Sequence, residues 1–499
     1  MKRIGVVIAA ISCLFTQLAA QSANSVYVSD AIRFSTPGLG SGARSLGMGD
    51  AYTGVANDYS ALYWNPAGLA QLQYGEFSFG LSYLNYKDQS TYYGLSQSQA
   101  NNSTTLNTLG LVFPAPVKRG SLVFAFGFNR ESNYTTGMSL THPDANSVIQ
   151  SLAYDRDTVL ADDLGNNIAW RLFLADTTLG SGHWRHFINN NNRPDSAFAY
   201  TWDSPIKDRV TQLEKVLEGG GLNDWSVGGA MDIARNLSLG ITLTYQSGSY
   251  KYDGKYTERD DQNVYHSTQI DDPRNFASME IADLVESDLS GVNARVGLLF
   301  RDPDRYRFGV SIKTPTILHV KETFGTTYTS TPDFGDQVTV PPDNLSNEYD
   351  LVTPWVFSAG GSLILSDLVL SADVDYTDWT QLEFRDANPD IIALNQDISD
   401  IFRATANVRV GAEYAIPPSG VRVRGGFMYN TSPFQGDPSS FDQKYFTVGL
   451  GIPLSEFTMF DLAYAHGWYD TIRGSYDGTA PINETVHTNN FLGTLSVRF

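Results

Sequence analysis

Hydrophobic residues stand at every second position in many short stretches of this chain, with polar or small residues between them. The last stretch, FLGTLSVRF, places Phe491, Gly493, Leu495, Val497 and Phe499 on one face. Successive side chains of a strand point to opposite faces, so a period of two predicts β-strands. The same period predicts fourteen strands, at 77–84, 107–113, 122–129, 225–234, 237–250, 290–300, 306–313, 355–364, 368–380, 403–414, 421–431, 445–452, 457–467 and 491–499.

The connections between these strands alternate in length. The short ones are 114–120, 235–236, 301–305, 366–367, 416–420 and 453–456. Between them lie the long ones, 85–105, 131–224, 251–288, 314–353, 382–402, 432–443 and 468–489. Bacterial outer-membrane barrels have an even number of strands, short periplasmic turns and long external loops. The pattern therefore predicts an all-β fold, a transmembrane antiparallel β-barrel of about fourteen strands that crosses the membrane many times.

Some predicted external loops have a helical period instead. The stretch 204–221 has Ser204 and Pro205 at its start and apolar residues on one face, the stretch 388–402 is similar, and 276–289 has a weaker version. These patterns predict helices in the loops. Their apolar faces would either pack against other loops as a lid or form a groove that gathers an apolar ligand.

The first residues predict export. Lys2 and Arg3 precede a mostly apolar stretch, and Ala19 and Ala20 offer a small-residue cleavage site, so residues 1–20 read as a signal peptide. Cys13 is the only cysteine and lies inside that signal. The mature chain is therefore expected to lack disulfide bonds and thiolate metal ligands.

Residues 21–73 precede the first strand and are too few for a separate domain. They contain the Gly- and Ala-rich stretch GARSLGMGDAYTGVANDYSALYW and then NPAGLAQL. A barrel of this size has a lumen to fill, and glycine permits close backbone approach. We expect this segment to form a hatch on the periplasmic side of a barrel that spans 74–499. Asn65 and Pro66 favour a turn that seats the hatch or moves when ligand binds.

Composition narrows the function. The net charge of −20 argues against a nucleic-acid partner, and an aromatic content of 12% suits a membrane barrel. No G-x-S-x-G, H-E-x-x-H or P-loop motif occurs, so we expect no enzyme, no catalytic residue, no metal site and no cofactor.

Strand parity places charged side chains in the lumen. If Val408 and Val410 face lipid, Arg409 points inward, and the same alternation applies to the other strands. The basic residues predicted to face the lumen are Arg295, Lys313, Arg409, Arg422 and Arg424, and the acidic ones are Asp373, Asp375, Glu413 and Asp461. A basic residue could hold a ligand carboxylate by a charge-assisted hydrogen bond. The alternative is that these charges pair with one another and with the hatch.

The stretch 42–72, with Asn65, Pro66, Ala67 and Gly68, resembles the FadL-type outer-membrane transporters of long-chain fatty acids and other hydrophobic compounds. The stretches 368–384, 408–434 and 444–466 are also similar to that family, whereas 131–224 and 251–353 are not. The resemblance implies a monomeric barrel with an N-terminal hatch in its lumen. It further implies that external loops capture the ligand and that the ligand leaves sideways through a gap in the wall.

The expected function is passive uptake of hydrophobic compounds, such as long-chain fatty acids or hydrocarbons, across the outer membrane of a Gram-negative-type bacterium. The expected partners are a fatty-acid-like ligand, outer-membrane lipid and, through the terminal Phe499, the outer-membrane assembly machinery. The alternative is a barrel that serves protein secretion or surface anchoring, since PorV-type barrels have a similar opening motif. A further alternative is another structural outer-membrane protein.

Overall fold

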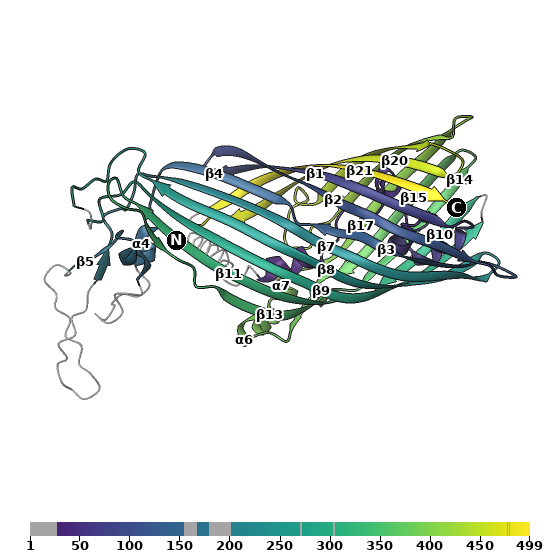
Figure 1. Ribbon diagram of the computed structural model, residues 1–499, viewed down its shortest axis with the longest axis horizontal. Coiled ribbons are helices and arrows are strands. Elements are labelled where there is room, and N and C mark those ends of the chain that lie inside the picture. The colour runs from purple at the N-terminus through teal and green to yellow at the C-terminus, as the bar shows by residue number, and fades with distance from the viewer. Residues whose placement is uncertain are drawn as a thin grey trace, which may run out of the picture.

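The computed structural model describes residues 27–153, 167–178, 201–269, 272–302, 305–476, 478 and 480–499. It is an elongated antiparallel β-barrel whose strands run obliquely along the long axis (Figure 1). The predicted signal peptide lies outside the described residues. Among the described residues, no helix is long and apolar enough to span a bilayer.

Fourteen strands close the wall, as predicted, because β1 pairs with β21. They are β1 (Glu76–Tyr92), β2 (Leu95–Ala115), β3 (Leu122–Asn133), β7 (Val210–Ala234), β8 (Leu237–Arg259), β9 (Ser278–Asp302), β10 (Tyr306–Lys313), β14 (Val356–Leu365), β15 (Leu368–Asp378), β17 (Ala404–Ile416), β18 (Val421–Asn430), β19 (Gln443–Pro453), β20 (Thr458–Gly474) and β21 (Pro481–Arg498).

Five further strands of the same sheet extend the wall at its loop-bearing end. They are β4 (Thr136–Ala145), β11 (Ile317–Thr331), β12 (Val338–Val340), β13 (Leu345–Val352) and β16 (Glu383–Arg385). Pro315 separates β10 from β11, and Pro354 separates β13 from β14. Proline has no N–H to give to the ladder, so each wall strand is interrupted there and resumes beyond.

The alternation of faces agrees with the predicted parity. On β17, Val408 and Val410 are 46% and 44% exposed, whereas Arg409 and Glu413 are buried. Aromatic side chains such as Trp225, Tyr245 and Phe357 also lie on the outer face. The outward apolar surface is the one that a hydrocarbon environment requires, and the inward surface carries the charges.

Two helix predictions were wrong. The stretch 204–221 lies largely in β7, and 276–289 lies largely in β9. The local period of four suggested helices, but β7 pairs with β4 and with β8 along most of this stretch. The ladder satisfies the backbone on both sides, and this tertiary pairing overrides the local propensity. Strands thus run through much of the ranges predicted as long loops.

The helix prediction for 388–402 is confirmed. This stretch forms α6 (Pro389–Ala393), η4 (Leu394–Gln396) and α7 (Ile398–Ile401). Asn388 caps α6 by accepting a 3.0 Å hydrogen bond from the Ile391 amide. The remaining loop elements are α4 (Ile149–Ala153), α5 (Ile168–Arg171), β5 (Asp176–Thr178), β6 (Thr201–Asp203) and η3 (Trp379–Gln381).

Residues 27–75 lie inside the barrel. A helix occupies 27–35, followed by α2 (Ala43–Gly47), α3 (Ala61–Trp64) and η1 (Pro66–Gln71). The segment from 36 to 75, called the hatch below, packs at the end of the barrel that carries the short turns. Its last residue, Gly75, exchanges backbone hydrogen bonds of 3.0 and 2.9 Å with Phe499, so the hatch leaves the lumen beside the C-terminus.

Candidate functional site

The Asn65 side chain joins the hatch turn to the barrel wall. Asn65 has an extended backbone between α3 and η1, and its Oδ1 accepts a 3.2 Å hydrogen bond from the Ala67 amide. Its Nδ2 donates to the Thr53 carbonyl at 3.0 Å and to the Leu298 carbonyl on β9 at 3.1 Å. Asn65 is fully buried, so the motif predicted as a turn also carries a contact to the wall.

Glycines line the wall where the hatch touches it. An added Cβ on Gly297 would lie 2.0 Å from Asn65 Oδ1, and one on Gly110 would lie 1.9 Å from the Tyr59 ring. The inward glycines whose added Cβ would lie 3.0 Å or less from a hatch atom are Gly110, Gly127, Gly228, Gly240, Gly309, Gly360, Gly411, Gly426 and Gly449 in addition to Gly297. This set, called the glycine belt below, spans ten wall strands. It lets the hatch lie against the backbone of the wall.

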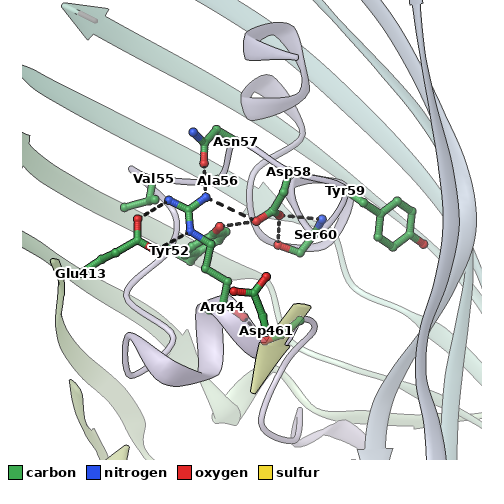
Figure 2. Close-up of polar contacts among 12 residues, drawn as sticks. Arg44, Tyr52, Val55, Ala56, Asn57, Asp58, Tyr59, Ser60, Glu413 and Asp461 are labelled. Carbon is green, nitrogen blue, oxygen red and sulfur yellow. Dashed lines mark hydrogen bonds and ion pairs between the residues drawn. The ribbon is translucent and has the colours of Figure 1, made fainter. Parts of the chain in front are cut away.

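Arg44 of α2 is the hatch residue that pairs with a wall carboxylate. Figure 2 shows its guanidinium between Glu413 of β17 on one side and Asn57 and Asp58 of the hatch on the other. Arg44 Nη2 and Nε each lie 2.8 Å from a Glu413 oxygen, and Nη1 lies 2.6 Å from Asn57 Oδ1. Tyr52 donates a hydrogen bond to Asp58 in the same group. A bidentate arginine–carboxylate pair adds geometric specificity, so Arg44 holds the hatch in one orientation on β17.

Arg424 and Arg422 share the other side of Glu413. Arg424 Nε donates to Glu413 at 2.7 Å and its Nη1 donates to Asp461 at 2.6 Å. Arg422 Nη1 lies 3.6 Å from Glu413. Both predicted lumen arginines are therefore held by carboxylates of the wall and lie beneath the hatch, as the alternative of mutual pairing predicted.

Arg409 supports the middle of the hatch. It pairs with Asp375 on the neighbouring strand, and its guanidinium lies 5.6 Å from the Trp64 ring centroid. Asp373 accepts a 2.5 Å hydrogen bond from the Thr53 amide. Asp50 lies in this group, and burial raises the pKa of its carboxyl to about 7, with Arg409 opposing the shift and Asp373 and Asp375 reinforcing it. Asp50 Oδ1 has no hydrogen-bond partner among the described residues.

Arg295 and Lys313 face each other on β9 and β10 above the hatch. Lys313 Nζ lies 2.6 Å from Glu131 of β3, across the lumen. The Arg295 guanidinium lies 5.7 Å from the Tyr63 ring centroid. Of the five predicted basic residues, Lys313 and Arg295 are thus the pair on the loop-bearing side of the hatch.

An apolar cluster fills the lumen beyond the hatch. The helix 27–35 contributes Val28, Ala31 and Phe34 to it, and the Phe34 ring lies 5.6 Å from that of Tyr250. The other buried members are Tyr134, Leu222, Tyr250, Leu289, Leu318, Val320, Tyr349, Leu351, Trp379, Leu382, Phe384, Ile391, Leu394, Ile398 and Phe402. They come from the wall and from η3, η4, α6 and α7. This set is called the apolar chamber below.

Trp379 lies at the end of a predicted strand, yet it is 6% exposed and belongs to the apolar chamber. Its Nε1 donates a 2.9 Å hydrogen bond to Thr405 Oγ1. The turn η3 directs the ring inward, which strand alternation alone could not indicate.

Charged residues fasten the helix 27–35 at the chamber wall. Arg33 pairs with Asp30 one turn earlier, and its Nη2 lies 3.6 Å from Glu218 on β7. Arg473 of β20 lies 3.3 Å from Glu218 and 2.8 Å from Glu484. The Arg33 guanidinium also lies 4.5 Å from the Tyr250 ring centroid. The helix is thus held by a polar face as well as an apolar one.

The wall has a seam between β2 and β3. Their ladder ends at the pair Thr108 and Asn129, although β1 continues to pair with β2 beyond it. Past that point side chains bridge the two edges, with Asn133 Nδ2 donating to Ser103 Oγ at 2.8 Å. Asn101 Nδ2 donates at 2.8 Å to the carbonyl of Thr136 in β4. This stretch is called the β2–β3 seam below.

Hatch residues 38–42 join the two edges of the seam at its origin. Ser41 Oγ donates to Asn129 Oδ1 on β3 at 2.6 Å and lies 3.1 Å from Thr108 Oγ1 on β2. The Gly38 amide donates to the Glu131 carbonyl at 2.8 Å. The Gly42 amide donates to Asn107 Oδ1 at 3.2 Å, where a bulge interrupts the β1–β2 register. The hatch and the seam are therefore one connected structure.

The sequence patterns did not predict the glycine belt, the position of the helix 27–35 in the apolar chamber, or the contact of Ser41 with the wall. The signal for the belt was present, because glycine recurs at inward positions of most predicted strands. The signal for the helix was the apolar spacing of Val28, Ala31 and Phe34. Ser41 carried no signal, since its partners are distant in sequence.

Comparisons with known proteins agree on the type of molecule. A family model described as BamG matches residues 191–474. The Pseudomonas putida toluene transporter TodX has a similar structure, with a TM-score of 0.53 and 13% sequence identity over 92% of this chain and 99% of its own. A Pseudomonas aeruginosa FadL homologue has a TM-score of 0.52 and 14% identity over 93% and 99%. At these identities the shared property is the fold of an outer-membrane channel. A sequence comparison with curated proteins gives no match.

Proposed function

We propose that this chain, which belongs to the BamG family, carries small hydrophobic molecules passively across an outer membrane. The observation that carries the proposal is the apolar chamber, a large buried apolar cluster in the lumen of a transmembrane barrel. The solved structures of the same fold are described as a toluene transporter and a FadL homologue. Their fold supports the same class of substrate here.

The apolar chamber is suited to a solute that is poorly soluble in water. Each methylene removed from water contributes about 0.8 kcal/mol, so an apolar side-chain lining attracts an alkyl chain. In the described structure the helix 27–35 places Val28, Ala31 and Phe34 where such a chain would lie. We therefore assign the ligand site to the chamber, with the helix giving way as ligand enters.

The hatch favours release to the side. Glycine-belt contacts leave no room for a side chain between hatch and wall, so a straight path to the periplasm would require the hatch to leave its seat. The β2–β3 seam lacks a backbone ladder beyond Thr108 and Asn129. We propose that ligand leaves through this seam into the bilayer and that movement of residues 38–42 opens it.

Lys313 is the basic residue that best suits a ligand carboxylate on the proposed path. Arg409, Arg422 and Arg424 lie beneath the hatch and hold wall carboxylates. Lys313 lies beside the seam and pairs with the Glu131 carboxylate, and the backbone carbonyl of the same residue accepts a hydrogen bond from the Gly38 amide. A fatty-acid carboxylate that replaced Glu131 at Lys313 would loosen the hatch contact at the seam.

Uptake of labelled oleate and labelled toluene tests the proposal. Cells that lack their own fatty-acid transporter would express this chain, with the folded barrel in the outer-membrane fraction quantified by heat-modified gel mobility. Uptake above the empty-vector level is expected, and it should fall in Leu318→Asn, which buries an amide in the chamber. The matched control is Leu363→Asn, because Leu363 lies on the outer face and is 53% exposed. No uptake of either compound by a folded surface barrel would contradict the proposal.

The BamG match supports a second function, a structural role beside other outer-membrane assembly proteins. It agrees with the expectation of a barrel that acts through a protein partner. Gentle solubilisation and affinity purification would distinguish the two. A stoichiometric protein partner combined with no uptake would favour the structural role, whereas a monomer that takes up ligand would favour transport.

A further inference from the structure

The outer wall carries a hollow that the transport path does not use. It has a volume of about 460 Å³ and lies across β19, β20, β21 and β1, which pair in that order, with Thr104 of β2 at its margin. The strands β20, β21 and β1 run side by side in Figure 1. Its apolar lining is outward-facing, with Leu81, Leu450 and Leu462 all exposed. The hollow therefore opens to the surroundings of the barrel and not to the lumen.

Gly493 creates the hollow. In the strand register, Leu450, Leu462, Gly493 and Leu81 stand side by side on four adjacent strands. Three large side chains flank one position that has none. A Cβ added at Gly493 would lie 3.4 Å from Leu462 and 3.9 Å from Phe460, which is ordinary contact. No neighbouring atom lies close enough to require glycine at this position. The absence of a side chain there leaves the hollow open.

The rows above the hollow change from apolar to polar in a regular order. The next row toward the loop-bearing end contains the rings of Tyr464, Phe491 and Tyr83, and the ring centroids of Tyr464 and Phe491 lie 4.9 Å apart. Beyond it, Asn489 Oδ1 accepts from Tyr464 Oη at 2.7 Å and lies 3.0 Å from His466 Nδ1. This is the gradient found at a membrane–water interface.

A basic row follows. Lys87 of β1 pairs in register with His487 of β21, and His487 pairs with Trp468 of β20. The His466 and His487 rings are stacked 5.7 Å apart. Lys444 stands next to Trp468 but donates to the Ser439 and Asp442 carbonyls. Lys87 and His487 are therefore the basic side chains of this row that face outward without such contacts.

The chain has a net charge of −20, so a basic row without carboxylate partners departs from the overall charge. Among outward lysines of other strands, Lys251 pairs with Glu286 and Lys321 with Glu348, whereas the exposed Lys215 of β7 has no ion pair within the described residues. Within the described chain, no carboxylate forms an ion pair with Lys87. The nearest outward acid in the strand register is Asp470, one row further, where Thr485 donates to it at 3.0 Å. The row is thus complementary to an anion.

The spacing between the basic row and the hollow matches one bilayer leaflet. Six residues separate His487 from Gly493, about 20 Å along the strand and about 15 Å along the membrane normal at the usual tilt. This is half of the roughly 30 Å hydrocarbon core. A lipid whose headgroup lay at Lys87 would place the end of an acyl chain at Gly493.

We propose that this face is a binding site for one anionic lipid, with its phosphate at Lys87 and His487 and an acyl chain in the hollow at Gly493. The site is separate from the apolar chamber and does not depend on the transport function. A lipid bound at this site would stay at one place on the wall, unlike the bulk lipid that surrounds every barrel.

Native mass spectrometry of the delipidated full chain, titrated with dioleoylphosphatidylglycerol or dioleoylphosphatidylcholine, tests the site. One phosphatidylglycerol is expected to bind more tightly than phosphatidylcholine. Gly493→Val fills the hollow without meeting the backbone and should weaken both lipids about threefold, the effect of losing about five dispersion contacts with an acyl chain. Lys87→Gln should weaken only phosphatidylglycerol, about fivefold.

The matched control is Gly361→Val on β14. Gly361 also faces outward, and a Cβ there would meet its nearest neighbour at 3.7 Å. This variant should bind both lipids like the unaltered protein. Equal binding of the two lipids, or equal binding by the two valine variants, would overturn the proposal, because the lipid would then be held by general contact with the wall.

Discussion

Ser41 of the hatch donates a 2.6 Å hydrogen bond to Asn129 of β3 at the last rung of the β2–β3 ladder. The same hydroxyl lies 3.1 Å from Thr108 on β2, so one buried serine links both edges of the wall. The structure thereby couples the position of the hatch to the point where the wall stops being held by its own backbone.

Ser41→Ala should loosen the seam. The variant leaves Asn129 Oδ1 without its 2.6 Å donor in a buried position, a loss of about 1–3 kcal/mol. Hydrogen exchange at the amides of residues 129–132 should become faster. Ser311→Ala is the control, because Ser311 also donates from the wall to the hatch, at 3.1 Å to the Trp64 carbonyl, but lies away from the seam. Equal exchange at 129–132 in both variants would contradict the coupling.

Phe34→Ala should make the apolar chamber accessible. Phe34 is 2% exposed and packs on Tyr134 and Tyr250, so its truncation should weaken docking of the helix 27–35 by about 3 kcal/mol. Binding of a fluorescent naphthylamine probe to the purified barrel should increase. Ser29→Ala alters an exposed position of the same helix and should leave probe binding unchanged. Unchanged binding in Phe34→Ala would separate the helix from the ligand site.

Gly110→Ala should unseat Tyr59. The new methyl group would overlap the Tyr59 ring, which is 1% exposed. Overpacking of this kind costs about 1–3 kcal/mol and should lower the unfolding temperature. Tyr59→Leu in the same chain should restore part of the loss. If the double variant is less stable than the sum of the two single changes, the contact is not the cause.

Hatch stability should depend on pH through Asp50. The pKa of its carboxyl is about 7 in the folded protein and 3.8 ordinarily. The seated hatch therefore binds more protons between about pH 4 and 7, and stability falls as pH rises through that window. The stabilisation is fully present below about pH 4. Asp373, Asp375 and Arg409 are the charged groups around it.

Asp50→Asn removes the titrating group with little change of shape, and asparagine tolerates the positive φ of 52° at this position. Hydrogen-exchange protection of residues 43–56 should then vary less between pH 5 and 8 than in the unaltered chain. An identical pH profile in the two proteins would show that another group controls hatch seating.

Strand parity explains why much of the lumen could be predicted. A residue's neighbours alternate between outside and inside whatever the strand is paired with, so Arg409, Glu413 and Arg424 were placed in the lumen from sequence alone. Their partners were not predictable in the same way. Arg44 and Glu413 are separated by 369 positions, and only closure of the barrel around the hatch brings them together.

The helical stretches show the limit of local patterns. Residues 388–402 form helices because Asn388 and Pro389 start them and no strand competes. Residues 204–221 have a comparable period but enter β7, where two neighbouring strands supply hydrogen bonds. Local propensity is a difference of tenths of a kcal/mol per residue, which a paired ladder outweighs.

The alternating pattern by itself determined the barrel, its fourteen wall strands and the face of the side chains within them, and the Gly- and Ala-rich opening predicted an N-terminal segment able to fill the lumen. The tertiary structure alone decided that inward glycines receive the hatch, that the helix 27–35 occupies the apolar chamber and that Ser41 joins the seam. The physical reason is the distance along the chain over which each feature is determined. Face and period follow from backbone geometry within a few residues, whereas close packing depends on surfaces that meet only when the wall has closed.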